Sequence, residues 1–160
     1  MLTLIATNSA LKWILFEKYF SSYAPVLKSV ETDPGHEILC LAENQIREYF
    51  SGIRKAFDVP IAIEGTLFQK SVWELLLKIP YGQTVSYGEI AGRLGDRKKA
   101  RPVGGAVGLN PAPIIIPCHR VIGQDGSLTG FGGGLYVKSF LLNLENRCKG
   151  LRPSVSGHHV

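Results

Sequence analysis

Residues 86–110, SYGEIAGRLGDRKKARPVGGAVGLN, decide the fold that we predict for the second half of the chain. Ser86 is followed three residues later by Glu89, which is the spacing of a capping box, so a helix is expected to begin at Ser86. A second helix is expected over 101–109, and Pro102 fits it only in the first turn. Two short helices joined by a tight basic turn indicate a helix-turn-helix, although an ordinary helical hairpin with a solvated turn is the commoner source of this pattern.

The segments around this helix pair complete a mainly helical region. Apolar spacing predicts a helix over 68–79, which Pro80 and Gly82 end. The run IIIPCHRVIG, residues 114–123, is expected to be a buried strand, and a glycine-rich loop follows it. A last helix is expected over 135–145, with these side chains directed inward: Leu135, Val137, Phe140, Leu141 and Leu144.

The first third of the chain predicts a smaller unit. Short strands are expected over 1–6 and 13–16, a helix over 36–57, and a strand and turn over 58–66. The predicted fold class is therefore α/β (α+β), with a small N-terminal sheet-plus-helix domain and a helix-turn-helix, winged-helix-like C-terminal domain. The predicted boundaries are 1–65 for the first domain, 66–150 for the second and 151–160 for a loose tail.

Composition restricts the class of protein and its partners. With 160 residues, 45% hydrophobic and 19% charged, the chain is expected to be globular, and no apolar run approaches a membrane span. Three scattered cysteines and the lack of a signal-peptide pattern favour a cytoplasmic location. Residues 1–65 hold six basic and eight acidic side chains, whereas 66–160 hold twelve and five. This asymmetry of charge indicates that the second half binds a polyanion. The alternative is that the basic residues only keep the protein soluble.

Cys118 and His119 are adjacent at the end of the apolar run. A thiol with a pKa of about 8.5 is mostly protonated at neutral pH, so it needs a base or a positive field to react. Neighbouring side chains of a strand point to opposite faces, and a water would therefore have to relay the proton unless the backbone turns sharply. Glu145 is the acid that could orient the histidine. A buried structural cysteine beside a surface histidine is the simpler alternative.

The motifs PCHRVIG, SYGEIA, VGGAVGLNP and GFGGGLYVKSFLLNLE, over residues 65–146, resemble the O6-alkylguanine-DNA alkyltransferases, also called methylated-DNA–protein-cysteine methyltransferases. The resemblance implies repair of O6-alkylguanine in double-stranded DNA by transfer of the alkyl group to a cysteine, once per molecule. It further implies base flipping, a minor-groove helix with little sequence preference, a monomer, and neither metal nor organic cofactor.

The resemblance also assigns roles to individual residues. Cys118 is the acceptor, His119 the water-mediated base, Glu145 the orienting carboxylate, Asn110 a brace for the strand, and Tyr87 a donor to guanine. Arg101 is the finger that replaces the extruded base. The remaining DNA contacts are expected at Lys98, Lys99, Ala100, Pro102 and Gly105. The substrate pocket is expected to comprise Tyr87, Val107, Pro113, Val121, Phe131 and Gly132.

Two departures from the family pattern stand out. Pro102 occupies the position after the finger arginine where the family usually has alanine, and proline there removes a backbone donor and adds bulk at the DNA surface. The first 60 residues match poorly, and His36 with Cys40 are expected to be structural rather than zinc ligands. Three alternatives are a non-catalytic protein that binds alkylated DNA, a helix-turn-helix regulator and a cysteine hydrolase. Cys118 argues against the first, and the PCHRVIG motif against the second.

Overall fold

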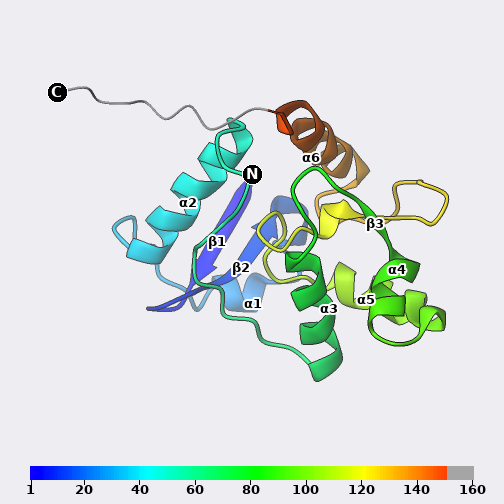
Figure 1. Cartoon of the computed structure of the whole chain (residues 1–160). Coiled ribbons are helices and arrows are strands. Elements are labelled where there is room, and N and C mark those ends of the chain that lie inside the picture. The colour runs from blue at the N-terminus through cyan, green and yellow to red at the C-terminus, as the bar shows by residue number, and fades with distance from the viewer. Residues whose placement is uncertain (151–160) are drawn as a thin grey trace.

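The computed structural model describes residues 1–150, and the expected tail over 151–160 lies outside the described residues. Its helices and small sheets form the mixed architecture that the sequence predicts (Figure 1). Within the described residues, no helix is both long enough and apolar enough to cross a membrane.

The N-terminal third contains a hairpin and a covering helix. Strands β1 (Leu2–Ala6) and β2 (Leu11–Phe16) pair in antiparallel register, with Leu2 opposite Phe16. A 3-10 turn, η1 (Glu17–Tyr19), and a short helix, α1 (Ala24–Leu27), lead to α2 (Glu37–Phe50). Helix α2 contacts both strands through one apolar face, as the i, i+4 spacing of Ile38, Ala42 and Ile46 predicts.

Two predictions for this third were wrong. Helix α2 ends at Phe50 instead of continuing to residue 57, because Gly52 follows with a φ of 77° and reverses the chain. The segment 58–66 forms no strand of its own, and Ile61 makes only an isolated bridge to Leu11. This segment is therefore an irregular connection, and its backbone is hydrogen-bonded to Leu11 of β2.

The predicted helix pair is present in the second half. Helix α3 (Leu67–Leu77) is followed by α4 (Tyr87–Arg93), the 3-10 turn η2 (Arg97–Lys99) and α5 (Ala100–Gly108). Ser86 caps α4, and both hydrogen bonds of the predicted capping box are formed. Pro102 lies in the first turn of α5, where its missing N–H leaves no bond unmade.

The expected strand over 114–123 is mostly irregular backbone, which corrects the prediction. Only Val121–Ile122 form a strand, β4, which pairs in parallel with β3 (Val85–Ser86). Cys118–Arg120 form the 3-10 turn η3, and Ile114 has a φ of 78°. The run is apolar because it is buried, and Pro113 and Pro117 lack the N–H groups that a central strand would need.

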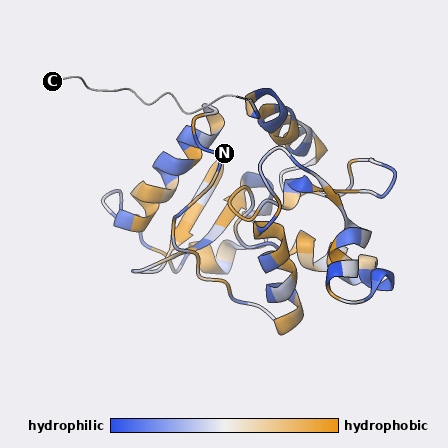
Figure 2. Ribbon diagram, in the orientation of Figure 1, coloured by the Kyte–Doolittle hydropathy of each residue, from blue (hydrophilic) through white to orange (hydrophobic). Residues whose placement is uncertain are grey.

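Helix α6 (Leu135–Cys148) buries Leu141 and Leu144 as predicted, and Val137 packs against the same cluster, but the rest of the buried face differs from the prediction. Leu135 and Phe140, expected inside, are 49% and 41% exposed. The buried positions are Lys138, Leu141, Leu144 and Glu145, which repeat at three- and four-residue intervals. Two polar side chains, Lys138 and Glu145, therefore occupy buried places that hydrophobicity alone assigns to apolar residues. Hydrophilic and hydrophobic residues are mixed along α6 (Figure 2).

The main hydrophobic core draws on both halves of the sequence. Leu11 and Ile14 of β2 belong to the same buried cluster as Trp73, Val103 and Cys118. The backbone N–H of Ile14 donates to Pro111 O at 2.9 Å, which ties the hairpin to the segment before the cysteine. The division near residue 65 stays a prediction, and the two segments share one apolar interior.

Candidate active site and nucleic-acid interface

Cys118 is held in a sharp backbone turn. It opens η3 directly after Pro117, and its backbone N–H donates to Ile116 O at 2.8 Å. Asn110 braces the segment before it, since its Nδ2 donates to Ile116 O at 2.7 Å and its Oδ1 accepts from Ala112 N. Cys118 is 4% exposed, and its burial raises the pKa of the thiol to about 11. The hydrogen bond from Asn110 and the positive charge of Lys138 oppose this shift. At neutral pH the thiol therefore keeps its proton until a base takes it.

His119 and Glu145 form a fully buried pair. The Nε2 of His119 lies 2.7 Å from Oε1 of Glu145, and neither side chain is exposed. Burial lowers the pKa of His119, although Glu145 opposes the shift, so the imidazole is neutral at pH 7. A carboxylate only accepts hydrogen bonds, so Nε2 carries the proton and Nδ1 is the basic nitrogen. Nδ1 is buried and bonds to no other described residue.

Three further groups converge on Glu145. Arg120 donates through Nε and Nη2 at 3.0 and 2.9 Å, and its Nη1 donates to Ile79 O. The hydroxyl of Tyr49 donates at 2.7 Å, and so does the backbone N–H of Gly82, at 2.8 Å. Burial by itself would raise the pKa of Glu145, but the hydrogen bonds from His119 and Arg120 lower it to about 2. The carboxylate is therefore ionised and fixed in orientation.

Lys138 of α6 is a second buried charge near the cysteine. Its ammonium donates to the carbonyls of Val121 at 2.5 Å and Thr129 at 2.8 Å, and lies 3.5 Å from that of Gly130. Burial lowers the pKa of Lys138, and interaction with Cys118 opposes this. Among the described residues, no carboxylate pairs with it. The cation therefore joins β4 to the glycine-rich loop and favours the thiolate.

The residues expected to form the substrate pocket lie around the same core. Val107, Pro113 and Val121 are buried, whereas Tyr87, Phe131 and Gly132 are half-buried. Tyr87 and Phe131 pack against the cluster that contains Cys118. The hydroxyl of Tyr87 lies 3.3 Å from both Thr129 O and the Thr129 hydroxyl, so it is held at the glycine-rich loop.

The residues expected to contact DNA form an exposed surface on η2 and α5. Lys98, Lys99, Arg101, Pro102 and Gly105 are exposed and Ala100 is half-buried. Asp96 caps η2 by accepting from the backbone of Lys98. A Cβ atom built on Gly105 would meet no other atom within 4 Å, so folding does not require glycine there. A close approach by a partner would explain this position, as at other sites where backbone meets a ligand.

Comparisons with known proteins agree with this geometry. Residues 67–147 match the family model described as 6-O-methylguanine DNA methyltransferase, DNA binding domain. The chain belongs to the methylated-DNA–protein-cysteine methyltransferases. A Methanosarcina acetivorans member of that name is 56% identical over 107 residues, which are 67% of this chain and 69% of the relative. These proteins are DNA-repair methyltransferases, and the chain is an enzyme of this class that binds DNA.

Solved structures show the same fold. The Mycobacterium tuberculosis O6-methylguanine methyltransferase superposes with a TM-score of 0.82 at 46% identity, covering 91% of this chain and 86% of its own. A structure of the same organism's protein in complex with DNA superposes with a TM-score of 0.76 at 41% identity, covering 92% and 87%. The helix-turn-helix of this methyltransferase thus lies in a domain of the DNA-binding type.

Several residues of this methyltransferase site escaped the sequence predictions. Tyr49, Arg120 and Lys138 are polar groups whose buried hydrogen bonds depend on contacts distant in sequence. Two sequence signals were available: Arg120 is adjacent to the Cys-His pair, and Tyr49 lies on the apolar face that predicts the helix over 36–57. Trp73 was expected simply as an apolar face residue, yet its indole N–H donates to Ala106 O at 2.9 Å and ties α5 to α3.

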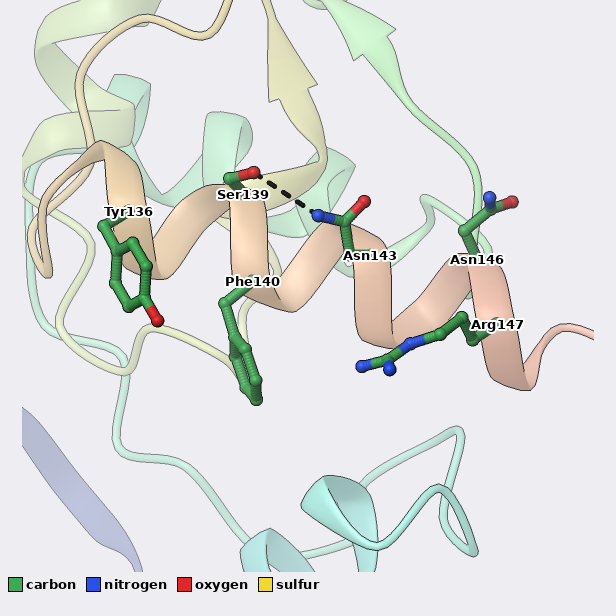
Figure 3. Close-up of a pocket in the computed structure, with 6 residues that line it drawn as sticks. All are labelled: Tyr136, Ser139, Phe140, Asn143, Asn146 and Arg147. Carbon is green, nitrogen blue, oxygen red and sulfur yellow. Dashed lines mark hydrogen bonds between the residues drawn. The ribbon is translucent and has the colours of Figure 1, made fainter.

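Two cavities of the methyltransferase lie away from the predicted site residues, whereas a third is lined by Tyr81, Pro117 and Arg120 among others and borders the segment that holds Cys118. Figure 3 shows one along α6, where Tyr136, Phe140 and Arg147 project from the helix, and none of the predicted site residues lines it. Another lies between β1 and α2, where His36 and Cys40 contribute to the wall. Within residues 1–150, no group of three or more His, Cys, Asp or Glu side chains is placed to hold a metal ion.

Proposed function

We propose that this methyltransferase repairs O6-alkylguanine in double-stranded DNA by transferring the alkyl group to Cys118, once per molecule. The observation that carries the proposal is the placement of Cys118 directly beside the buried His119–Glu145 pair. A structural cysteine would need no such neighbours. Burying two ionisable groups costs folding free energy, and such groups cluster at functional sites.

The reaction is a displacement at the alkyl carbon. The sulfur of Cys118 attacks that carbon, a sulfur–carbon bond forms, and the carbon–O6 bond breaks with its electron pair leaving on guanine. The thiol proton passes to His119, and the hydroxyl of Tyr87 donates to the leaving guanine. The thioether product is stable, so the protein acts once.

The electrostatics favour His119 as the base. Its Nδ1 is buried and uncommitted, and the bond from Nε2 to Glu145 stabilises the imidazolium that proton uptake would create. Cys118 and His119 are neighbours in the 3-10 turn η3, whose three residues per turn direct adjacent side chains about 120° apart, so a bridging water would carry the proton from sulfur to Nδ1. The positive charge of Lys138 would stabilise the thiolate formed in this step.

The DNA would bind across η2 and α5. The exposed basic residues would contact phosphates, and the small residues of α5 would allow the helix to enter the minor groove. The target base must leave the stack to reach a buried sulfur, and Arg101 would fill the space that it leaves. Readout in the minor groove is degenerate, which suits repair at any sequence. We place this activity in the cytoplasm, on chromosomal DNA, with a monomer as the acting unit.

A stoichiometric transfer assay tests the proposal. The protein is mixed with excess duplex carrying one O6-methylguanine, and the intact masses of protein and DNA are measured. The proposal expects each protein to gain the mass of one methylene while an equal amount of DNA loses it, with no further turnover. Unchanged protein mass with retained binding to the damaged duplex would contradict it and favour the non-catalytic damage-binding alternative. Repeated turnover would contradict it in favour of hydrolysis.

A further inference from the structure

The glycine-rich loop beside the active site is held on one side by residues of the C-terminal half. Lys138 donates to the carbonyls of Thr129 and Gly130, and Tyr87 contacts Thr129 through its hydroxyl. Gly130 and Gly134, near the two ends of the loop, have φ values of 37° and 92°. These contacts fix the entrance of the loop but leave its central residues, Phe131 to Gly133, to be positioned by something else.

The other side of the loop is packed against the N-terminal hairpin. The ring of Phe16, the last residue of β2, lies edge-on to Phe131 with 5.6 Å between ring centroids. A Cβ atom on Gly133 would come within 2.8 Å of the Phe16 ring, and one on Gly132 within 3.5 Å of Tyr19. The loop backbone therefore lies directly on two aromatic residues far from it in sequence.

Phe131 contacts both the N-terminal hairpin, through Phe16, and the candidate active site, through His119. Its ring lies between the N-terminal aromatic residues and the active site, edge-on to His119 with 6.5 Å between centroids. It also packs against the apolar cluster that includes Cys118. Phe131 cannot move toward the hairpin while Phe16 occupies that space, because packed interiors leave little free volume.

We propose that Phe16 is a specificity-determining residue that sets the size of the alkyl group accepted beside Cys118. The inference rests on the proposed function, since it takes Phe131 as the wall that faces the alkyl group. It gives the N-terminal segment a direct part in substrate selection. Removing the Phe16 ring would let Phe131 retreat and make room for a larger substituent.

The test compares two substrates. Single-turnover transfer is measured from duplexes carrying O6-methylguanine or O6-benzylguanine, for the full chain and for the variants Phe16→Ala and Phe16→Leu. We expect the benzyl-to-methyl rate ratio to rise about tenfold in Phe16→Ala, and less in Phe16→Leu, since a few methylene groups of pocket space are worth that much discrimination. Phe50→Ala is the matched control, because the Phe50 ring lies edge-on to Tyr49 and tilted against Phe140 and makes no ring contact with Phe16 or Phe131.

A second arm tests the contact itself. Gly133→Ala should slow transfer in the wild-type background, where the new methyl group meets the ring of Phe16 and, at 3.0 Å, that of Phe131. Part of the loss should be recovered in the Phe16→Ala background, where Phe131 has room to move away from the methyl group. An unchanged substrate ratio in both Phe16 variants, or a rise equal to that of Phe50→Ala, would overturn the inference. If the wild-type protein transfers neither group, the proposed function itself fails, so the two failures are distinguishable.

Discussion

The buried His119–Glu145 cluster and the proposed DNA-binding surface of this methyltransferase differ in how far their side chains are exposed. Glu145 is fully buried and accepts hydrogen bonds from His119, Arg120, Tyr49 and a backbone N–H. The side chains of η2 and α5 that would contact DNA are exposed. A group that moves a proton must be held in one place before the substrate arrives. A surface that scans DNA must instead remain open to its partner, so we expect mutations in the two regions to differ in kind.

The largest effect is expected in the buried cluster. Glu145→Gln keeps the side-chain volume but leaves the buried guanidinium of Arg120 without its counter-charge, which should destabilise the fold by about 3–5 kcal/mol. It also removes the group that orients His119, so transfer should slow by about a hundredfold or more. Chemical denaturation and single-turnover transfer at low temperature measure the two effects.

The exposed pair of Glu43 and Arg47 on α2 supplies the control for this substitution. Glu43→Gln breaks an ion pair of similar length, 2.6 Å, at the surface, where such pairs contribute about 0–1 kcal/mol. Equal destabilisation by the two substitutions would show that burial of the Glu145 cluster has no special role.

On the binding surface, Arg101→Ala should act through DNA alone. We expect affinity for the damaged duplex to fall by about 1–3 kcal/mol, or roughly ten- to a hundredfold, with the melting temperature unchanged because the side chain is exposed. Fluorescence anisotropy at several salt concentrations measures the affinity and its salt slope. Arg47→Ala, on the remote helix α2, is the matched control. A shift in melting temperature comparable to that of Glu145→Gln would erase the distinction between the two regions.

The pH dependence should report the buried base. Burial lowers the pKa of His119 below its usual 6.5, so its imidazole stays neutral, and able to accept a proton, down through that pH. Transfer at saturating duplex should therefore hold its rate as pH falls to 6.5 and decline only below it, where the imidazole becomes protonated. Stopped-flow transfer over this range measures the decline. In His119→Gln the residual transfer rate should no longer decline below pH 6.5. The same decline in this variant would show that another group titrates.

The smallest effect is expected at Gly105. Alanine fits the open space there and should stabilise α5 by about 0.5–1 kcal/mol, since glycine is unfavourable within a helix. The same methyl group would lie on the DNA-facing surface and should weaken duplex binding a few-fold. Thermal melting and anisotropy on one sample measure both effects. A Gly105→Ala variant that is more stable and binds the duplex as tightly as the wild type would show that α5 need not approach the DNA closely at this position.

Local sequence signals predicted the helix-turn-helix well because its boundaries depend on near neighbours. The Ser86–Glu89 capping box is complete within four residues, and Pro102 restricts the helix that contains it. The segment 114–120 misled the prediction because an apolar run indicates burial but not conformation. Pro117 within this segment, and the positive φ at Ile114, make it an irregular turn.

The polar half of the active site was harder to predict. Cys118, His119 and Glu145 were expected together, and the structure brings His119 and Glu145 into contact beside the cysteine. Tyr49 shares the apolar face of α2 with Ile38 and Ile46, so its burial follows from the sequence pattern, but its hydrogen bond to Glu145 does not. Lys138 is charged and would ordinarily be assigned to a solvated face. Only the packing of distant elements makes these two side chains internal donors.

The central claim is that proton transfer to the buried His119–Glu145 pair, rather than accessibility, makes one thiol reactive. Cys40 is exposed, Cys148 is half-buried and Cys118 is buried, so the three cysteines form an internal comparison. The most direct measurement is peptide mapping by mass spectrometry after reaction with one equivalent of duplex containing O6-methylguanine. The account predicts methylation of Cys118 alone, with both other peptides unmodified. Methylation of Cys40 or Cys148 at a comparable level, or its persistence in a Cys118→Ala variant, would contradict it.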